Sequence, residues 1–240
     1  MRPALIRAVI DREALRANLR LLRARADGAH VMAVVKANAY GHGLVPTALA
    51  LPEADAFAVA RLEEGVALRD AGVRQPIVLL EGVFSAEQLA EAARQDFEIV
   101  VHTGEQVALL EQSRAAHRFI VWLKIDTGMN RLGFRLAQFP AAYARVRALS
   151  APAREIRLLT HLARADERDC EQTLEQIERF REVAAPLGLA TSIANSAGIL
   201  GWTAARASWV RPGLALYGVS PFADADGSRL GLCPAMRFET

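Results

Sequence analysis

The sequence predicts an α/β fold of the (β/α)8 type, a closed TIM-type barrel. Eight short apolar runs alternate with longer amphipathic stretches, which is the order of a parallel sheet with crossover helices. The runs are almost continuously apolar, as expected for strands that are buried on both faces. The length of 240 residues suits one such barrel. A doubly wound open sheet is the alternative that the same alternation allows.

We expect the strands at the eight apolar runs. In chain order these are residues 31–36, 56–60, 76–82, 97–101, 119–126, 155–161, 189–196 and 214–218. The stretches between them predict helices over residues 61–72, 85–95, 103–115 and 166–188. Ser85 is a typical N-cap, and Thr103 with Gln106 three residues later has the pattern of a capping box.

The composition excludes several kinds of partner. Lys+Arg is 29 and Asp+Glu is 27, and the basic residues are scattered, so we expect no nucleic-acid binding. No run approaches 18 apolar residues and the N-terminus lacks the apolar core of a signal peptide, which predicts a cytoplasmic protein with no membrane association. The two cysteines match no metal-ligand spacing and fit a reducing compartment.

Polar residues recur at the ends of the predicted strands, where the active site of a (β/α)8 barrel lies. The residues that end a run are Lys36, Lys124, His161, Asn195 and Ser196. Arg211 introduces the run at 214–218. Because five of the eight strands deliver such a group to one rim, the sequence predicts a catalytic or binding site there.

Lys36 lies in the stretch VVKANAYGHG, after three apolar residues and before two glycines. Desolvation favours the neutral amine of a lysine, which is a nucleophile that forms a Schiff base with an aldehyde. Gly41 and Gly43 allow close approach of the backbone to a ligand, and Tyr40 could face the same site. The alternative is a lysine that simply extends into solvent at the strand end.

Lys124 follows five apolar residues in FIVWLKIDTGMNRLG, and a buried lysine is costly unless it is paired. If Arg131 on the following loop approaches it, an anion must lie between the two positive charges. Two separate salt bridges are the alternative. His161 could stack on or bond a flat ligand, although a hydrogen-bonded core histidine is the commoner explanation.

The segment RPG at 211–213 places a cation before a turn. The backbone N–H groups of Gly213 and Leu214, together with the Ser196 hydroxyl, could bind a phosphate group. The chain contains no GxGxxG or Walker sequence, no HExxH and no GxSxG. A nucleotide site, a metal site and a serine-hydrolase site are therefore not indicated.

Five motifs together resemble the alanine racemase family of fold type III pyridoxal 5′-phosphate (PLP) enzymes. In order, they are AVVKANAYGHG, WLKIDTGMNRLGF, THLARAD, NSAGIL and VRPGLALYG. The resemblance covers essentially the whole chain and implies an isomerase that interconverts L- and D-alanine, for D-alanine biosynthesis or for catabolism. The alternatives are a non-catalytic PLP-binding or PLP-homeostasis barrel protein and a racemase of another amino acid.

The resemblance also implies roles for the site residues. Lys36 would hold PLP as a Schiff base and act as the base on the D-face of the substrate. Arg211 would hydrogen-bond the pyridine nitrogen and leave it unprotonated, since a guanidinium keeps its own proton. His161 would pack against the ring and support Arg211. The phosphate would be bound by Tyr40, Ser196, Gly213 and Leu214, with Asn195 beside them.

Lys124 resembles the lysine that many family members carry as a carbamate. That carbamate would be the anion between Lys124 and Arg131, and it would orient Arg131 near the substrate carboxylate. Family members continue into a β-rich second domain, which supplies a tyrosine as the other catalytic base across a dimer interface. None of the three tyrosines of this chain lies in such a domain.

The resemblance therefore implies a domain organisation. We expect residues 11–230 to form the PLP-binding barrel without its partner domain. Residues 1–10 would pack with the second domain, and residues 231–240 would begin the crossover into it. Such a chain should bind PLP but racemise alanine weakly, because racemisation needs a proton donor or acceptor on each face of the substrate. The intact enzyme should be a homodimer.

Overall fold

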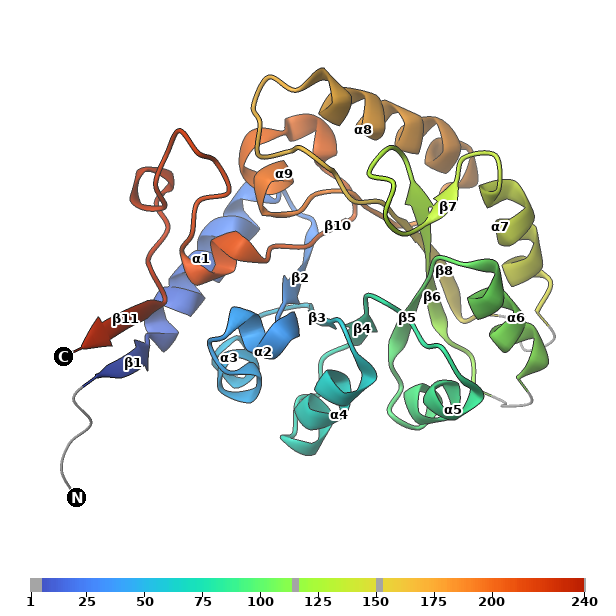
Figure 1. Cartoon of the computed structure of the whole chain (residues 1–240), viewed down its shortest axis with the longest axis horizontal. Helices are drawn as coiled ribbons and strands as arrows, with labels where there is room; N and C mark the ends of the chain where they lie inside the picture. Colours follow the sequence, from blue (N-terminus) through green and yellow to red (C-terminus); the bar gives the residue numbers. More distant parts are fainter. Residues whose placement is uncertain (1–5, 114–116, 150–152, 240) are drawn as a thin grey trace.

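The computed structural model describes residues 6–113, 117–149 and 153–239 and contains a closed barrel of eight parallel strands (Figure 1). The strands are β2 (His30–Val34), β3 (Ala56–Val59), β4 (Ile77–Leu79), β5 (Glu98–Val101), β6 (Ile120–Asp126), β8 (Glu155–Leu159), β9 (Thr191–Ser192) and β10 (Trp209–Val210). They follow one another around the barrel in this order, and β10 pairs again with β2. The prediction of a (β/α)8 barrel is confirmed, and the open sheet is excluded.

Helices surround the strands (Figure 1). They are α1 (Arg12–Arg25), α2 (Lys36–Tyr40), α3 (Leu44–Ala50), α4 (Leu62–Asp70), α5 (Ala86–Arg94), α6 (Gly104–Gln112), α7 (Phe139–Arg147), α8 (Glu171–Ala184) and α9 (Ser196–Gly201). The 3-10 turns are η1 (Ala185–Leu187), η2 (Thr203–Ala205), η3 (Leu214–Tyr217) and η4 (Ser228–Leu230). The four predicted helices correspond to α4, α5, α6 and α8, and residues 114 and 115 of the third lie outside the described residues.

The predicted helix caps are observed in part. The Ser85 hydroxyl accepts the N–H of Gln88 at 3.2 Å and begins α5. The Thr103 hydroxyl accepts the N–H of Gln106 at 3.3 Å. The side-chain carbonyl of Gln106 bonds instead to the N–H of His102, at 2.8 Å, so the prediction of a reciprocal capping box is wrong.

Apolar side chains form two separate layers. The inside of the barrel is filled by Met32, Val34, Ala56, Ala58, Val78, Val100, Ile120, Trp122, Leu159 and Trp209. A larger set packs between the strands and the surrounding helices. Toward the amino ends of the strands, the Arg157 guanidinium lies over the rings of Trp122 and Trp209 and pairs with Glu98 at 3.3 Å. This end of the barrel is filled by side chains, so a ligand site is expected at the carboxyl ends of the strands.

The predicted eighth strand at 214–218 is wrong. Residues Leu214–Tyr217 form η3, and the eighth strand is β10 at Trp209–Val210. Backbone bonds continue through the N–H of Arg211 to Ala194 at 2.9 Å and through the carbonyl of Pro212, which accepts the N–H of Val34 at 3.0 Å. Pro212 has no N–H of its own, so it cannot continue the ladder on its other side. A buried helical turn and a buried strand both appear as an apolar run, which explains the misreading. Arg211 therefore follows the eighth strand instead of introducing it, and it lies at the same rim.

The two ends of the described chain pair with each other outside the barrel (Figure 1). Strands β1 (Arg7–Ile10) and β11 (Met236–Glu239) form an antiparallel two-stranded sheet. Strand β7 (Phe134–Arg135) pairs in parallel with the last two residues of β6, Ile125 and Asp126. Of the predicted terminal segments, residues 1–5 and 240 lie outside the described part. Within that part, no helix combines the length and the apolar character needed to cross a membrane.

Candidate active site

The carboxyl ends of the barrel strands surround a cavity of about 490 Å³. The strand-end residues that line it are Lys36, Lys124, His161, Asn195, Ser196 and Arg211. Tyr40, Arg131, Gly213 and Leu214 line it from the loops that follow the strands. The structure thus brings these ten predicted residues into one cavity, whereas Gly41 and Gly43 are not among the residues that line it.

Lys36 and Lys124 are the only lysines in the sequence, and both lie in this cavity. Lys124 is 7% exposed, and burial lowers its pKa to about 8. The charges of Arg211 and Arg131 contribute to this lowered pKa, while Asp126 opposes them. The fold therefore makes the neutral amine of Lys124 accessible close to neutral pH.

Lys36 begins a left-handed turn. The φ angles of Ala37, Asn38, Ala39 and Tyr40 lie between 52° and 55°, a conformation that L-residues rarely adopt in succession. The carbonyl of Val35 accepts the N–H of Ala39 at 2.8 Å, and the side chain of Asn38 accepts the N–H of Leu44 at 2.9 Å. The chain therefore turns before the glycines, and the turn brings both Lys36 and Tyr40 to the cavity.

Arg211 is buried and has several acceptors. Its guanidinium donates to the hydroxyl of Ser192 and to the carbonyl oxygens of Thr160 and Ile193. Its Nη2 lies 3.5 Å from Nδ1 of His161. Desolvation, with Arg211 as the next cause, lowers the pKa of His161 to about 3, so the imidazole is neutral at pH 7. Since a guanidinium only donates, His161 accepts at Nδ1 and carries its proton on Nε2.

Ser196 organises an anion-binding corner. Its Oγ accepts the N–H groups of Gly213 at 3.0 Å and Ala215 at 3.1 Å, so its own hydroxyl hydrogen is free to donate to a ligand. The N–H of Leu214 begins η3 and has no acceptor within that turn. A Cβ atom at Gly213 would lie 2.5 Å from the Tyr40 Oη. The donors that face a ligand are therefore Ser196, Leu214 and Tyr40, while the N–H of Gly213 is occupied.

Sequence analysis missed other residues of the site. Glu81 and Asp166 also line the cavity, which they share with the four basic residues Lys36, Lys124, Arg131 and Arg211. The remaining excess of positive charge favours an anionic ligand. Glu81 lies within a predicted strand end and Asp166 within the THLARAD motif, and these positions could have identified them. Asn195 also has a local role, because its side chain caps α9 by accepting the N–H of Gly198 at 2.9 Å.

Fold and cavity together define a class of protein: a (β/α)8 barrel with a lysine- and arginine-rich ligand site at the carboxyl ends of its strands. Residues 10–221 match the sequence model described as alanine racemase, N-terminal domain. The chain therefore belongs to the alanine racemase family.

Named relatives support this membership. The alanine racemase of Shewanella loihica is 49% identical over 230 residues, which cover 96% of this chain and 64% of the relative. The catabolic alanine racemase of Pseudomonas aeruginosa is 48% identical over 241 residues, covering 100% of this chain and 66% of the relative. The crystal structure of the biosynthetic alanine racemase from Pseudomonas aeruginosa superposes with a TM-score of 0.92 at 42% identity, covering 98% and 65% of the two chains. The chain thus spans about two thirds of the length of these relatives.

Proposed function

We propose that this chain is the cofactor-binding barrel of a cytoplasmic, PLP-dependent alanine racemase that interconverts L- and D-alanine. The observation that carries the proposal is that one cavity combines the amine of Lys36, the buried guanidinium of Arg211 and the anion-binding corner at Ser196. The relatives named alanine racemase extend beyond the part that this chain matches, so the activity of the whole protein is included in the proposal.

The residues present fit PLP. Lys36 would hold the cofactor through its aldehyde carbon, and Arg211 would bond the pyridine nitrogen. The phosphate would accept hydrogen bonds from Ser196, Leu214 and Tyr40. The clearest support is the absence of a side chain at Gly213, which leaves room for the Tyr40 hydroxyl beside this corner. When bound, PLP supplies an electron sink that is conjugated with the Cα atom of the substrate.

Arg211 and His161 set the charge around the ring. Burial lowers the pKa of Arg211 to about 10, so its guanidinium keeps its positive charge at neutral pH and donates only. A pyridine nitrogen that accepts from it stays unprotonated. His161 is neutral and adds no further positive charge. The ring is then a weaker electron sink, which should limit side reactions such as transamination.

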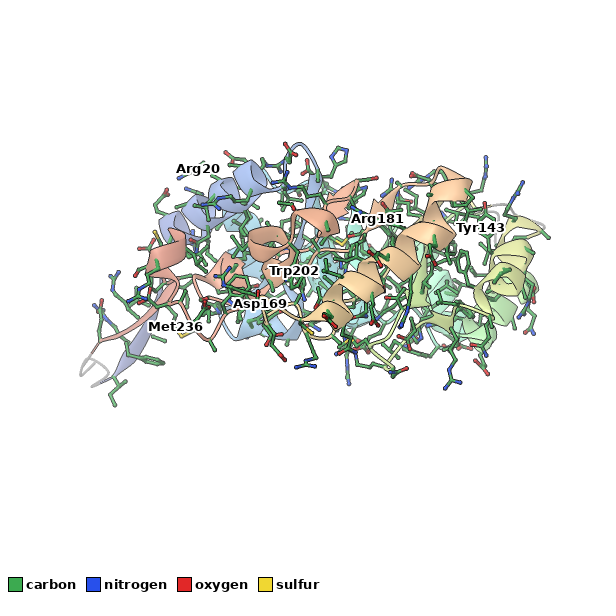
Figure 2. All side chains as sticks on the ribbon, turned by 90° about the horizontal axis from the view of Figure 1, so that it is seen from above. Arg20, Tyr143, Asp169, Arg181, Trp202 and Met236 are labelled. Atoms are coloured by element: carbon green, nitrogen blue, oxygen red, sulfur yellow. The ribbon has the colours of Figure 1, made fainter. Side chains whose placement is uncertain are left out.

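Lys36 would take and return the substrate α-proton on one face of the substrate. The described tyrosines offer no base for the other face. Tyr217 donates to the carbonyl of Val34 at 2.9 Å, and Tyr40 faces the phosphate corner. Tyr143 lies on α7, at the end of the molecule opposite Met236 (Figure 2). We propose that a β-rich domain of a partner subunit supplies the second base in a homodimer, and that the β1–β11 sheet packs against such a domain.

Lys124 is the proposed site of a carbamate. The neutral amine nitrogen would form a bond to the carbon of CO2 and release one proton, which leaves an anionic carbamate. Burial and the pKa of about 8 support this step, because it needs the unprotonated amine. The carbamate would accept hydrogen bonds from Arg131, which also lines the cavity and would lie near the substrate carboxylate.

The proposal is tested by incubating the protein with PLP, reducing it with borohydride and mapping the peptides by mass. The two lysines and the terminal amine are the only primary amines that can carry a pyridoxyl group. We expect the label on Lys36 and its loss in the Lys36→Ala variant. Label on Lys124 alone, or on neither lysine, would contradict the proposal.

A further inference from the structure

Gln176 of helix α8 is a buried residue that bonds to two residues of the cavity lining, His161 and Ala163, and to the buried Thr127 behind them, although it does not itself line the cavity. Its side-chain carbonyl accepts the N–H of Ala163 at 2.8 Å. Its amide nitrogen donates to the backbone carbonyl of His161 at 3.1 Å and to the Thr127 hydroxyl at 3.3 Å. One side chain therefore ties an outer helix (Figure 1) to the loops after β6 and β8.

The third contact leads on to Arg211. The Thr127 hydroxyl lies 2.9 Å from the Thr160 hydroxyl, and both residues are buried. The backbone carbonyl of Thr160 accepts from Nη2 of Arg211, the same nitrogen that faces Nδ1 of His161. Gln176 is thus connected to both members of the Arg211–His161 pair. It bonds directly to the backbone carbonyl of His161, and it reaches Arg211 through the side chains of Thr127 and Thr160 and the carbonyl of Thr160.

The local sequence allows helix α8 to approach this closely. A Cβ atom at Gly128 would lie 3.3 Å from Cγ of Gln176, and the φ of Gly128 is +141°. Both amide hydrogens of Gln176 have acceptors and its carbonyl has a donor. A buried polar group that is satisfied in this way rigidifies its surroundings, and removing it leaves its partners unpaired.

We propose that Gln176 is a positioning residue for the Arg211–His161 pair. It fixes the distance and orientation between Nη2 of Arg211 and Nδ1 of His161, and hence the direction in which Arg211 donates. The consequence for a bound pyridine ring rests on the proposed function. The positioning itself is a property of the chain without cofactor.

The test is nitrogen NMR of cofactor-free protein with labelled histidine and arginine. In Gln176→Met, which keeps the side-chain length but removes all three bonds, we expect the His161 Nδ1 and Arg211 Nε resonances to shift away from their wild-type positions. The matched control is Gln172→Met. Gln172 lies one turn earlier on α8 and donates only to the carbonyl of Gly128, at 3.3 Å, so the same resonances should stay in place.

A second variant separates the bond that the Gln176 side chain accepts from the two bonds that it donates. Gln176→Glu keeps an acceptor for the N–H of Ala163 but lacks the amide donor, so it should also shift the His161 and Arg211 resonances. Wild-type resonance positions in either folded variant, as judged by circular dichroism, would overturn the proposal. Shifted resonances in a protein that takes no borohydride label at Lys36 would reject the proposed function and leave the positioning intact.

Discussion

At the scale of single residues, Lys124 carries an unfavourable charge in this fold. It is buried beside Arg211 and Arg131, and its pKa falls from 10.5 to about 8. Between pH 8 and 10.5 the folded state therefore binds fewer protons than the unfolded state, so stability rises with pH in that window. Below pH 8 the full penalty of holding the charged lysine is present.

Replacing Lys124 by methionine should remove this penalty. In buffer free of CO2, we expect Lys124→Met to raise the free energy of unfolding at pH 7 by about 3 kcal/mol and to abolish the rise between pH 8 and 10.5. Urea titrations at several pH values measure both effects. Arg20→Met, on an exposed position of α1, is the control and should change neither. A variant that keeps the wild-type pH slope would show that Lys124 is not the titrating group.

Sequence reasoning located residues of one kind and missed another. Lys36, Lys124 and His161 were predicted at the rim because an ionisable residue at the end of an apolar run is unusual. Gln176 gave no such signal, since one glutamine in a polar, amphipathic helix looks like a solvent-exposed residue. Its importance depends on the three groups that tertiary folding places around it.

At the scale of elements, the left-handed turn Ala37–Tyr40 is the clearest departure from local preference. Asparagine tolerates a positive φ, but alanine and tyrosine do not favour it, so ANAY contains no signal for this conformation. Tyr217 packs against this turn from outside, and the centroid of its ring lies 4.9 Å from the centroid of the Tyr40 ring. Strained backbone of this kind occurs where the surrounding structure determines it, and such places are often functional sites.

Ala37 tests how much strain the turn holds. Its side chain is exposed, so Ala37→Gly removes no packing and should relieve the unfavourable φ. Glycine also makes the unfolded chain more flexible, which offsets part of this benefit. We therefore expect a net gain of about 0.5 kcal/mol in the free energy of unfolding. Ala67→Gly, at an exposed position inside the right-handed helix α4, should lower it by about 0.5–1 kcal/mol. Urea unfolding of both variants compares the two, and equal effects would mean that the turn is unstrained.

The eighth strand could not be located from the sequence for a different reason, which is its length. Strand β10 has two residues, Trp209 and Val210, which is too short for any periodic pattern. The apolar run after it forms η3 because the Pro212–Gly213 pair interrupts the sheet. A strand at 214–218 would have placed Arg211 at the amino end of the barrel, opposite the site. Arg211 lies at the rim of the site because the strand ends at Val210, directly before it.

At the scale of the whole molecule, barrel closure is what gathers the site. Strands β2 and β10 are far apart in sequence but pair directly, with Val210 opposite Val31, so Lys36 and Arg211 reach the same cavity. This was predictable, because parallel strands in a closed barrel place their carboxyl ends at one rim. The donors at the anion-binding corner were not predictable, because Ser196 accepts the N–H of Gly213 and so removes it from the donors that can reach a ligand.

The whole chain should exchange the α-hydrogen on one face of the substrate without efficient transfer on the other face. With PLP bound, we expect it to exchange the α-hydrogen of D-alanine with solvent deuterium about 100-fold faster than it racemises alanine, because the described residues bring one proton-transfer group to the substrate. Proton NMR in D2O measures the exchange, and chiral chromatography measures the racemisation. Lys36→Ala should lose both. Equal rates of exchange and racemisation would mean that this chain contains a second base.

The confinement of both lysines to the cavity has a practical consequence. Acylating reagents, amine-reactive dyes and activated surfaces normally attach to a protein at many places. On this chain they can meet one terminal amine and the two lysines of the cavity. Protection of Lys36 and Lys124 from acylation, with the terminal amine as the internal reference, thus becomes a direct assay for any compound that enters the cavity, without an engineered tag and without knowledge of the reaction.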